Sequence, residues 1–307
     1  MLTKEQIKER QNYLGGGDCA AVLGMSRFST PLTVWAEKTG NIIPEDISEK
    51  LRVKLGNKLE ATVADLFTEE TGKILHRKNE TIYHPTYKFL AANIDRRVVG
   101  ERAGFEAKTT GSYSYRDWEG ADEIPMEYLL QCIHYLAVTG WDKWYIACLI
   151  GNQKFVWKEI KREEKVINDL IKKEVFFWRE FVEKKVMPMQ ITRNDEDVLS
   201  QLFPQATEGA VTELDDQANA ICESLDSLKA DKKVLEGEIE QQENTLRALL
   251  KDNESGKSNN WLVSWKNQMD RRVNIDALKN EQQEIYNRYL VEKVKRVLRI
   301  KKLVKDK

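Results

Sequence analysis

The residues that could do chemistry lie between positions 92 and 111, in the stretch ANIDRRVVGERAGFEAKTTG. Glu106 and Lys108 stand two apart in an apolar run, so in a strand they project from one face. If the preceding run pairs antiparallel through the turn VVGERAG, Asp95 approaches Glu106 at the end of the sheet. Two close carboxylates repel unless a cation lies between them, and such oxygen ligands suit Mg²⁺ or Mn²⁺. Lys108 could then orient or deprotonate a water, which is the chemistry of metal-assisted phosphodiester hydrolysis.

The same spacing also fits an ordinary hairpin salt bridge, because 32% of the residues are charged. Two further features favour a site. Glu60 interrupts the apolar positions of a predicted helix, so we expect it at the edge of the buried face. Tyr128, Gln131 and Tyr135 recur at helical spacing and form a polar stripe on a helix otherwise rich in Leu and Ile.

The elements that must position these residues lie before residue 190. Apolar spacing, with Gly and Pro at the ends, predicts helices at 4–14, 19–24 with Asp18 as its cap, 30–40, 48–72 as one long helix or two, 124–140 and 163–185. Short apolar runs predict strands at 73–77, 80–84, 88–95, 97–100, 104–109, 144–150 and 154–160, the last two as a hairpin around GNQ. This order is typical of an α+β or mixed α/β fold with a central mixed sheet flanked by helices.

The character of the chain changes after Pro188. A polar, turn-rich linker is predicted at 191–211, followed by a C-terminal region at 212–307. Apolar residues with alternating spacings of four and three predict a long coiled-coil-type helix at 212–251, although a two-faced helix packing on its own domain fits equally. The helix ends at a linker that includes ESGKS, which lacks the first glycine of a phosphate-binding loop. A strand at WLVSWKN, a helix capped near Asn274 or Asp276, and a basic end follow.

Composition excludes several classes of protein. No apolar run approaches the length that spans a bilayer, and the first residues lack a secretory pattern, so we expect a cytoplasmic protein without a membrane partner. The four cysteines form no C-x-x-C pair, which argues against zinc knuckles, iron–sulfur clusters and disulfide scaffolds. The net charge of −1 does not indicate a polyanion partner, so any binding site for a polyanion must be a local basic patch.

Six ordered motifs resemble a known family: LGGGDCAAVLGMS, TPLTVWAEKTG, GNKLE, ANID, FEAKT and YLLQCIHYLAVTGW. In this order and at these distances they are similar to the YqaJ-type viral recombinase nucleases, phage relatives of the lambda-type exonuclease in the PD-(D/E)xK superfamily. The resemblance covers residues 10 to about 190 and implies a restriction-endonuclease-like core, with a nuclease domain at 1–190.

The resemblance also implies roles for individual residues. Asp95, Glu106 and the carbonyl of Ala107 would hold a metal ion, Glu60 would bind a second, and Lys108 would be the signature lysine. Gln131 and Tyr128 would complete the catalytic site from the helix. The DNA 5′ end would lie at four residues: Arg10, Gly16, Gly17 and Asp18.

The implied activity is Mg²⁺- or Mn²⁺-dependent 5′→3′ degradation of one strand of duplex DNA with two ions. It would resect linear ends in phage-type recombination and leave 3′ overhangs for a single-strand annealing protein. A homo-oligomer, such as a trimeric ring, and a phage or prophage protein in the cytoplasm of a bacterial host are also implied. A structure-specific DNA endonuclease and a non-catalytic DNA-binding adaptor of the same fold are the alternatives.

The chain departs from the family pattern at two positions. Gly17 stands where the family has a serine, so a hydroxyl expected at the phosphate turn is missing. Arg96 follows the metal-binding aspartate, where the family has a small residue. The first departure weakens the 5′-phosphate assignment, and the second leaves the metal ligands intact and could add a DNA contact.

Overall fold

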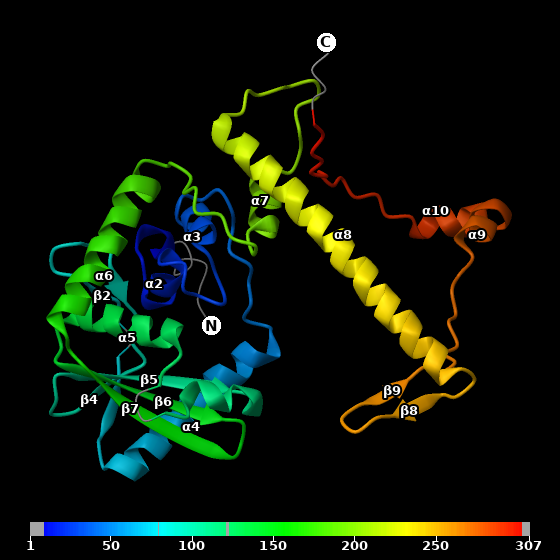
Figure 1. The fold of residues 1–307 in the computed structure, drawn as a ribbon. Helices are drawn as coiled ribbons and strands as arrows, with labels where there is room; N and C mark the ends of the chain where they lie inside the picture. Colours follow the sequence, from blue (N-terminus) through cyan, green and yellow to red (C-terminus); the bar gives the residue numbers. More distant parts are fainter. Residues whose placement is uncertain (1–8, 79, 121–122, 303–307) are drawn as a thin grey trace. The chain divides into compact units, whose positions relative to one another are not determined.

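The protein is described by a computed structural model that covers residues 9–78, 80–120 and 123–302. The chain divides into two compact units, one ending at Phe203 and the other beginning at Pro204 (Figure 1). Each unit is described by itself. Among the described residues, no helix combines the length and apolarity needed to cross a bilayer.

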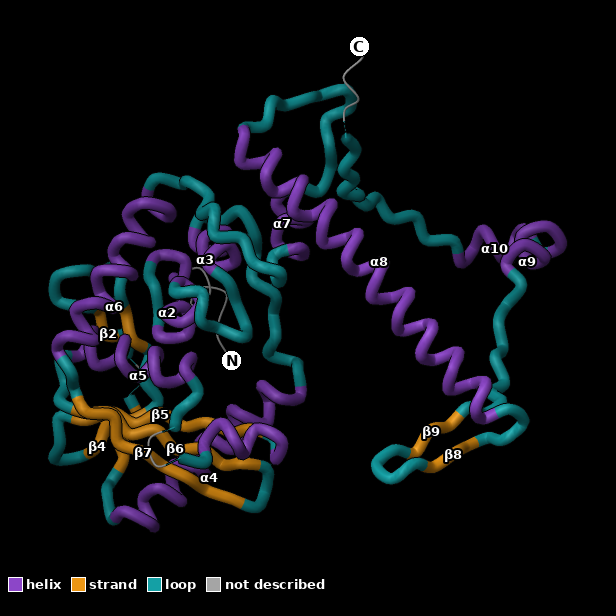
Figure 2. The backbone as a smooth tube through the Cα atoms, in the orientation of Figure 1, coloured by secondary structure: helices purple, strands orange, loops and turns teal. Residues whose placement is uncertain are grey.

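The first unit is built on a central mixed sheet, as predicted (Figure 2). This sheet has five strands. Its strands lie in the order β1-β4-β5-β6-β7, with bounds β1 Leu75–Arg77, β4 Arg96–Val98, β5 Ala103–Thr110, β6 Lys143–Ile150 and β7 Lys154–Lys161. The β5–β6 pair is parallel and the other pairs are antiparallel. A parallel pair needs a crossover connection, and the chain supplies one through the helix between these strands.

Helices cover both faces of the sheet. On one face, α4 (Leu51–Thr71) buries Val63 and Phe67 against Phe105 and Tyr145. The other face carries the larger core, to which α2 (Gly16–Val22), α3 (Pro31–Lys38), α5 (Met126–Thr139) and α6 (Glu164–Phe177) contribute. A π-helical segment, Trp178–Glu183, continues α6, and α7 spans Glu196–Leu202. The predicted α+β fold is therefore confirmed.

Local chemistry fixes several of the helix ends. The Thr30 hydroxyl accepts a hydrogen bond from the Thr33 amide at 3.1 Å, with Pro31 as the first helical residue of α3. Gly72 and Gly140 end α4 and α5 in the left-handed conformation, which lacks a steric cost only for glycine.

The predicted cap of α2 is wrong. The helix begins at Gly16 with Gly15 as its N-cap, so Asp18 lies inside the first turn. The Asp18 carboxylate accepts a hydrogen bond from the Gly15 amide at 2.9 Å. This is the reciprocal half of a capping box, which places an acid at the third helical residue rather than at the cap.

The segment before Asp95 is less regular than predicted. The strand expected at 88–95 is reduced to β3 (Ala91–Ala92), which pairs with β2 (Ile82–Tyr83) outside the main sheet. Leu14 takes part of the pairing, because its amide donates to the Phe89 carbonyl at 2.7 Å. Of the helix expected at 4–14, residues 4–8 lie outside the described residues, and Arg10–Asn12 form a 3₁₀ turn. A second 3₁₀ segment spans Ser112–Trp118.

The second unit contains α8 (Asp216–Leu250), capped by Asp215, as the long helix predicted at 212–251. The hairpin of β8 (Ser255–Lys257) and β9 (Leu262–Ser264) follows, and then α9 (Ile275–Glu281) and α10 (Gln283–Tyr289). The strand at 261–267 is confirmed. The linker prediction at ESGKS is wrong, because three of these residues pair with β9. Asn274 caps α9, and the single helix predicted after it is two short helices, α9 and α10.

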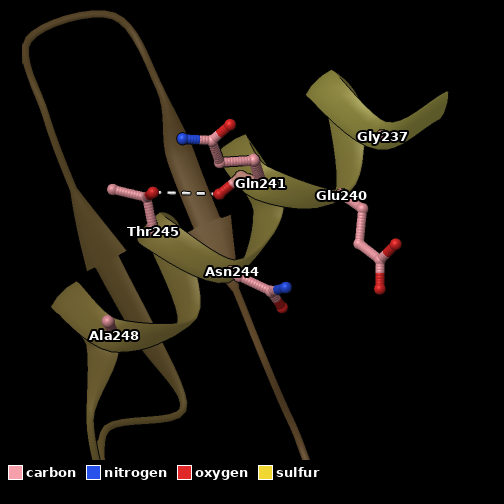
Figure 3. A pocket seen from close by; sticks show the side chains of 6 residues that line it. All are labelled: Gly237, Glu240, Gln241, Asn244, Thr245 and Ala248. Carbon is pink, nitrogen blue, oxygen red and sulfur yellow. Dashed lines mark hydrogen bonds between the residues drawn. The ribbon is translucent and has the colours of Figure 1, made fainter. Parts of the chain in front are cut away.

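The apolar stripe of α8 is exposed. We call it the seam; its exposed members are Leu214, just before the helix, and Ile221, Leu228, Leu235, Ile239, Leu246 and Leu249 within it. Among the described residues of this unit, Leu250 is the one hydrophobic side chain that is fully buried. Figure 3 shows a shallow hollow elsewhere on α8, lined by Gly237, Glu240, Gln241, Asn244, Thr245 and Ala248. None of these six is a seam residue, so the hollow and the seam are different surfaces.

Candidate active site

Asp95 lies beside β5 at the open end of the β4–β5 hairpin, away from the turn. The antiparallel register pairs Arg96 with Phe105, so Asp95, one residue earlier, falls opposite Glu106 and next to Ala107. The Ala107 amide donates a hydrogen bond to Asp95 Oδ2 at 3.0 Å. The N–H and C=O of a strand residue point to the same side, so the Ala107 carbonyl faces the edge at which Asp95 lies.

Glu106, Lys108 and Gln131 form one hydrogen-bonded group between β5 and α5. Lys108 Nζ donates to Glu106 Oε1 at 2.6 Å and to Gln131 Oε1 at 3.0 Å. Gln131 Nε2 donates to Glu106 Oε1 at 2.9 Å and to the Tyr135 hydroxyl at 2.7 Å. Because each polar end of Gln131 is engaged, the amide fixes the lysine and the glutamate relative to each other.

One carboxylate oxygen in this part of the site has no partner among the described residues. Glu106 is 4% exposed, and its Oε2 atom is buried with no hydrogen-bond partner in the described part of the chain. Burial and the neighbouring Glu106 carboxylate raise the pKa of Asp95 from 3.8 to about 8. An orphaned carboxylate oxygen beside an acid that resists ionisation is the environment that a divalent cation relieves. Asp95, Glu106 and the Ala107 carbonyl therefore fit a hard metal ion with waters completing its shell.

Lys108 keeps its proton. Burial alone would lower the pKa of Lys108, but the charge and hydrogen bond of Glu106 outweigh burial and raise it. The ammonium also lies 4.8 Å from the centre of the Tyr128 ring, within reach of a cation–π interaction. Lys108 is thus a hydrogen-bond donor at neutral pH, which favours orientation of a water over its deprotonation.

Glu60 lies on α4 and is engaged by two arginines. Its Oε1 atom is 3.2 Å from Arg96 Nη2 and 3.3 Å from Arg77 Nη2. Its side chain is 27% exposed, as expected for the edge of a buried face. The negative charge of Glu60 is the smallest of the contributions to the raised pKa of Asp95. Arg77 was not predicted, because its approach depends on strand pairing that the sequence does not display.

The glycine turn packs directly on α5. A Cβ atom on Gly16 would lie 2.6 Å from the Tyr135 ring and 2.9 Å from Gln131 Cγ, so only glycine allows this approach. A Cβ atom on Gly17 would meet nothing within 4 Å. Asp18 instead pairs with Lys38, at 2.7 Å.

Arg10 lies in the exposed 3₁₀ turn before these glycines, and its carbonyl accepts a hydrogen bond from Lys38 Nζ at 2.8 Å. Gly16 and Gly17 are thus next to the site, whereas the Asp18 carboxylate is already engaged within the fold.

A second polar cluster, also not predicted, lies in the core. His134 Nδ1 is 2.7 Å from Glu174 Oε1, and His134 Nε2 is 3.0 Å from the Ala91 carbonyl oxygen. Burial disfavours the imidazolium, but Glu174 outweighs this and raises the pKa of His134. Cys19 lies beside the pair, and all three side chains are fully buried. The cluster ties α5 and α6 to the strand that leads to Asp95.

Comparison with known proteins identifies the family. The YqaJ-like viral recombinase domain matches residues 7–142. The uncharacterized protein YqaJ of Bacillus subtilis (strain 168) is 33% identical over 295 residues, covering 94% of this chain and 91% of that protein. The chain belongs to the YqaJ family.

Solved structures extend this relation to the fold. An alkaline exonuclease from Laribacter hongkongensis is 18% identical, with a TM-score of 0.51, covering 60% of this chain and 94% of that one. Its complex with dAMP matches equally. This YqaJ-family chain therefore shares the exonuclease fold, and the predictions of family and fold are confirmed. The roles of the individual site residues stay predictions.

Proposed function

We propose that this YqaJ-family protein is a metal-dependent deoxyribonuclease, and specifically a Mg²⁺-dependent 5′→3′ exonuclease that resects linear duplex DNA. The observation that carries the proposal is the pair of carboxylates, Asp95 and Glu106, with an orphaned oxygen and a protonated lysine beside it. The viral recombinase domain and the fold shared with an alkaline exonuclease support the same activity.

Asp95 and Glu106, together with the Ala107 carbonyl, would hold Mg²⁺, with Mn²⁺ as a substitute. An ion bound there supplies Lewis acidity, which lowers the pKa of a water and offsets charge on the phosphate. In the reaction a water oxygen bonds to phosphorus, the bond from phosphorus to the 3′ oxygen breaks, and one water proton ends on that oxygen. The resemblance also implies a second ion at Glu60, where the two arginines now lie.

The chain's own groups orient the reactants. Lys108 donates hydrogen bonds and would aim a proton donor at the water or at a phosphate oxygen as charge develops. Gln131 holds Lys108 and Glu106 in one geometry, and the Tyr128 ring supports the ammonium from the other side. Removal of such a positioned donor typically lowers the rate by a factor on the order of 10²–10³.

The proposed direction of digestion leaves a 3′ overhang for a single-strand annealing protein, in the cytoplasm of a bacterial host that carries the phage or prophage. The closeness of Gly16 to Gln131 supports a DNA end at the glycine turn. Of the expected contacts, Gly16, Gly17 and Arg10 remain in the proposal. Asp18 is the least supported of the expected DNA contacts, because its carboxylate is already hydrogen-bonded and would repel a phosphate.

We also propose that the protein assembles with itself through the exposed seam of α8, with a trimeric ring as the form that the family resemblance implies. Heptad-spaced apolar residues that stay exposed in one chain are typical of a helix that pairs with another helix. Light scattering should give a multiple of the chain mass for the parent and a lower mass for Leu228→Glu. Ala230→Glu, on the exposed outer face of the same helix, is the matched control. Equal masses for all three proteins would refute assembly through the seam.

The activity is tested with purified full-length protein, end-labelled linear duplexes and closed circular duplexes in Mg²⁺. Nucleotide release from a 5′ end of linear DNA, with intact circles, is the expected result. Cutting of circles would favour the endonuclease, and binding without cutting would favour the adaptor.

Two substitutions test the site itself. Glu106→Ala and Lys108→Ala should each lower the rate at least ~10²-fold, because the first removes a ligand of the metal ion and the second removes the donor that positions the water or phosphate. Lys161→Ala, an exposed lysine at the end of β7, should not change it. Undiminished activity of either site variant would contradict the assignment.

A further inference from the structure

The two halves of the expected two-ion site differ in the partners of their carboxylates. Lys108 pairs with Glu106 Oε1 at 2.6 Å, but Glu106 Oε2 is buried without a hydrogen-bond partner among the described residues, so this corner keeps an unpartnered carboxylate oxygen. Glu60, by contrast, already has two guanidinium groups on one oxygen, at 3.2 and 3.3 Å. The Asp95–Glu106 half of the expected two-ion site therefore keeps a carboxylate oxygen that an ion could use, whereas the Glu60 half already has two guanidinium groups on its carboxylate.

Strand register places these arginines, so their approach is a property of the sheet. Arg77 pairs with Arg96 across β1 and β4, and Arg96 pairs with Phe105 across β4 and β5. Directly paired residues project from the same face, here the face covered by α4, on which Glu60 lies. The fold thus directs both guanidinium groups at the carboxylate.

The two arginines differ in burial. The Arg96 side chain is 13% exposed, whereas that of Arg77 is 57% exposed. Solvent screens an exposed charge far more than a buried one, so Arg96 supplies the stronger local field. The Arg96 Nε atom is also buried and lacks a hydrogen-bond partner among the residues that the structure describes. A buried donor of this kind is costly unless some ligand accepts from it.

A second divalent ion at Glu60 would have to enter against this buried charge and displace its hydrogen bond. A guanidinium, however, can itself do part of what such an ion does, because it carries fixed positive charge and matches phosphate oxygens with its planar fork.

We propose that Arg96 takes the place of the second metal ion, so that each nuclease unit works with one divalent ion at Asp95, Glu106 and the Ala107 carbonyl. Glu60 then holds the guanidinium in position, and Arg96 contacts the reacting phosphate and stabilises the charge that develops on it. This inference rests on the proposed nuclease function, and it replaces the two-ion site that the resemblance implies.

The number of bound ions tests the proposal without any substitution. The full-length protein is titrated with Mn²⁺ in a calorimeter, alone and with a phosphorothioate duplex, and its electron paramagnetic resonance spectrum is recorded. One ion per chain with an uncoupled six-line spectrum is expected. Two ions per chain, with the spin coupling typical of ions about 3.5–4 Å apart, would overturn the inference and leave the nuclease function standing. Absence of any bound ion would overturn both.

Substitutions then test the role of the arginine. Arg96→Ala should lower the rate by a factor on the order of 10²–10³ at low Mg²⁺, and part of the loss should be recovered at high Mg²⁺, as an ion enters beside Glu60. The double variant Glu60→Gln with Arg96→Ala should show no recovery. Arg97→Ala is the matched control, because Arg97 is the exposed neighbour and pairs with Gly104. Recovery of the rate at high Mg²⁺ in the double variant, or no recovery in Arg96→Ala, would contradict the proposal that Arg96 replaces the second metal ion.

Discussion

Asp95→Asn should stabilise the metal-free protein while abolishing its ion binding. The substitution keeps the size of the side chain, and the asparagine carbonyl can still accept the Ala107 amide hydrogen bond that Asp95 accepts at 3.0 Å. It removes a carboxylate that ionises only at a cost in free energy, because it is largely withdrawn from water and lies beside Glu106. The effect depends on pH in a way that identifies its cause.

The magnitude follows from the pKa. Asp95 has a pKa of about 8 in the folded protein against an ordinary value of 3.8. Between these two values the unfolded chain has lost the proton and the folded chain has kept it, so the free energy of unfolding falls as the pH rises. The slope is about 1.4 kcal/mol per pH unit, and the accumulated cost at pH 8 is at most about 6 kcal/mol. The asparagine variant lacks this cost, so its advantage grows from pH 4 to pH 8 and is constant above.

Urea denaturation in EDTA at pH 5, 6.5 and 8.5 measures this advantage. Mg²⁺ added at pH 8.5 should stabilise the parent and leave the variant unchanged, because only the parent has the ligand. Asp142→Asn is the control, since that aspartate is 66% exposed. An advantage of the Asp95 variant that is equal at pH 5 and pH 8.5, or a loss of stability at pH 8.5, would refute the assigned cause.

Other predictions test separate parts of the fold. Gly17→Ser should leave the melting temperature unchanged, because a Cβ atom there meets nothing within 4 Å. Gly16→Ala should lower both the melting temperature and the nuclease rate, because its Cβ atom would displace the Tyr135 ring. Equal effects of the two substitutions would contradict this. Glu174→Gln should cost about 3–5 kcal/mol in urea denaturation by breaking a buried ion pair, and a cost below 1 kcal/mol would contradict it. Hydrogen bonds from neighbouring lysines lower the pKa of Glu101 to about 2. Glu101→Gln should therefore lower the melting temperature above about pH 4.5, and the difference should shrink toward pH 2; a difference independent of pH would contradict this.

The parts of the fold that depend on neighbouring residues were predictable from the sequence. Thr30 and Pro31 at the start of α3, and Gly140 at the end of α5, are caps that act within one turn. The two-residue period was enough to put Glu106 and Lys108 on one strand face. The antiparallel turn was enough to bring Asp95 to the same end of the sheet. These inferences succeed because the chemistry that fixes each feature lies within a few residues of it.

The contacts that were missed join positions far apart in the chain. Arg77 reaches Glu60 only because β1 pairs with β4 in one register, and a shift by one residue would turn its side chain to the other face. His134 and Glu174 are 40 residues apart, on different helices, and neither stands out from its surroundings in the sequence. The strand at Ser255–Lys257 has no apolar alternation, so its pairing with β9 could not be predicted either.

The pH dependence of the activity should arise from binding of the metal ion. Lys108 has a raised pKa, so it stays protonated through neutral pH and does not switch there. Asp95 has a pKa of about 8 before an ion binds, so an ion that binds below that pH must displace a proton. The apparent affinity for Mg²⁺ should therefore rise about tenfold per pH unit up to about pH 8. At saturating Mg²⁺ the same proton is displaced at lower pH, so the activity profile should move toward acid as the Mg²⁺ concentration is raised. A profile that stays fixed would instead locate the titrating group outside the metal ligands.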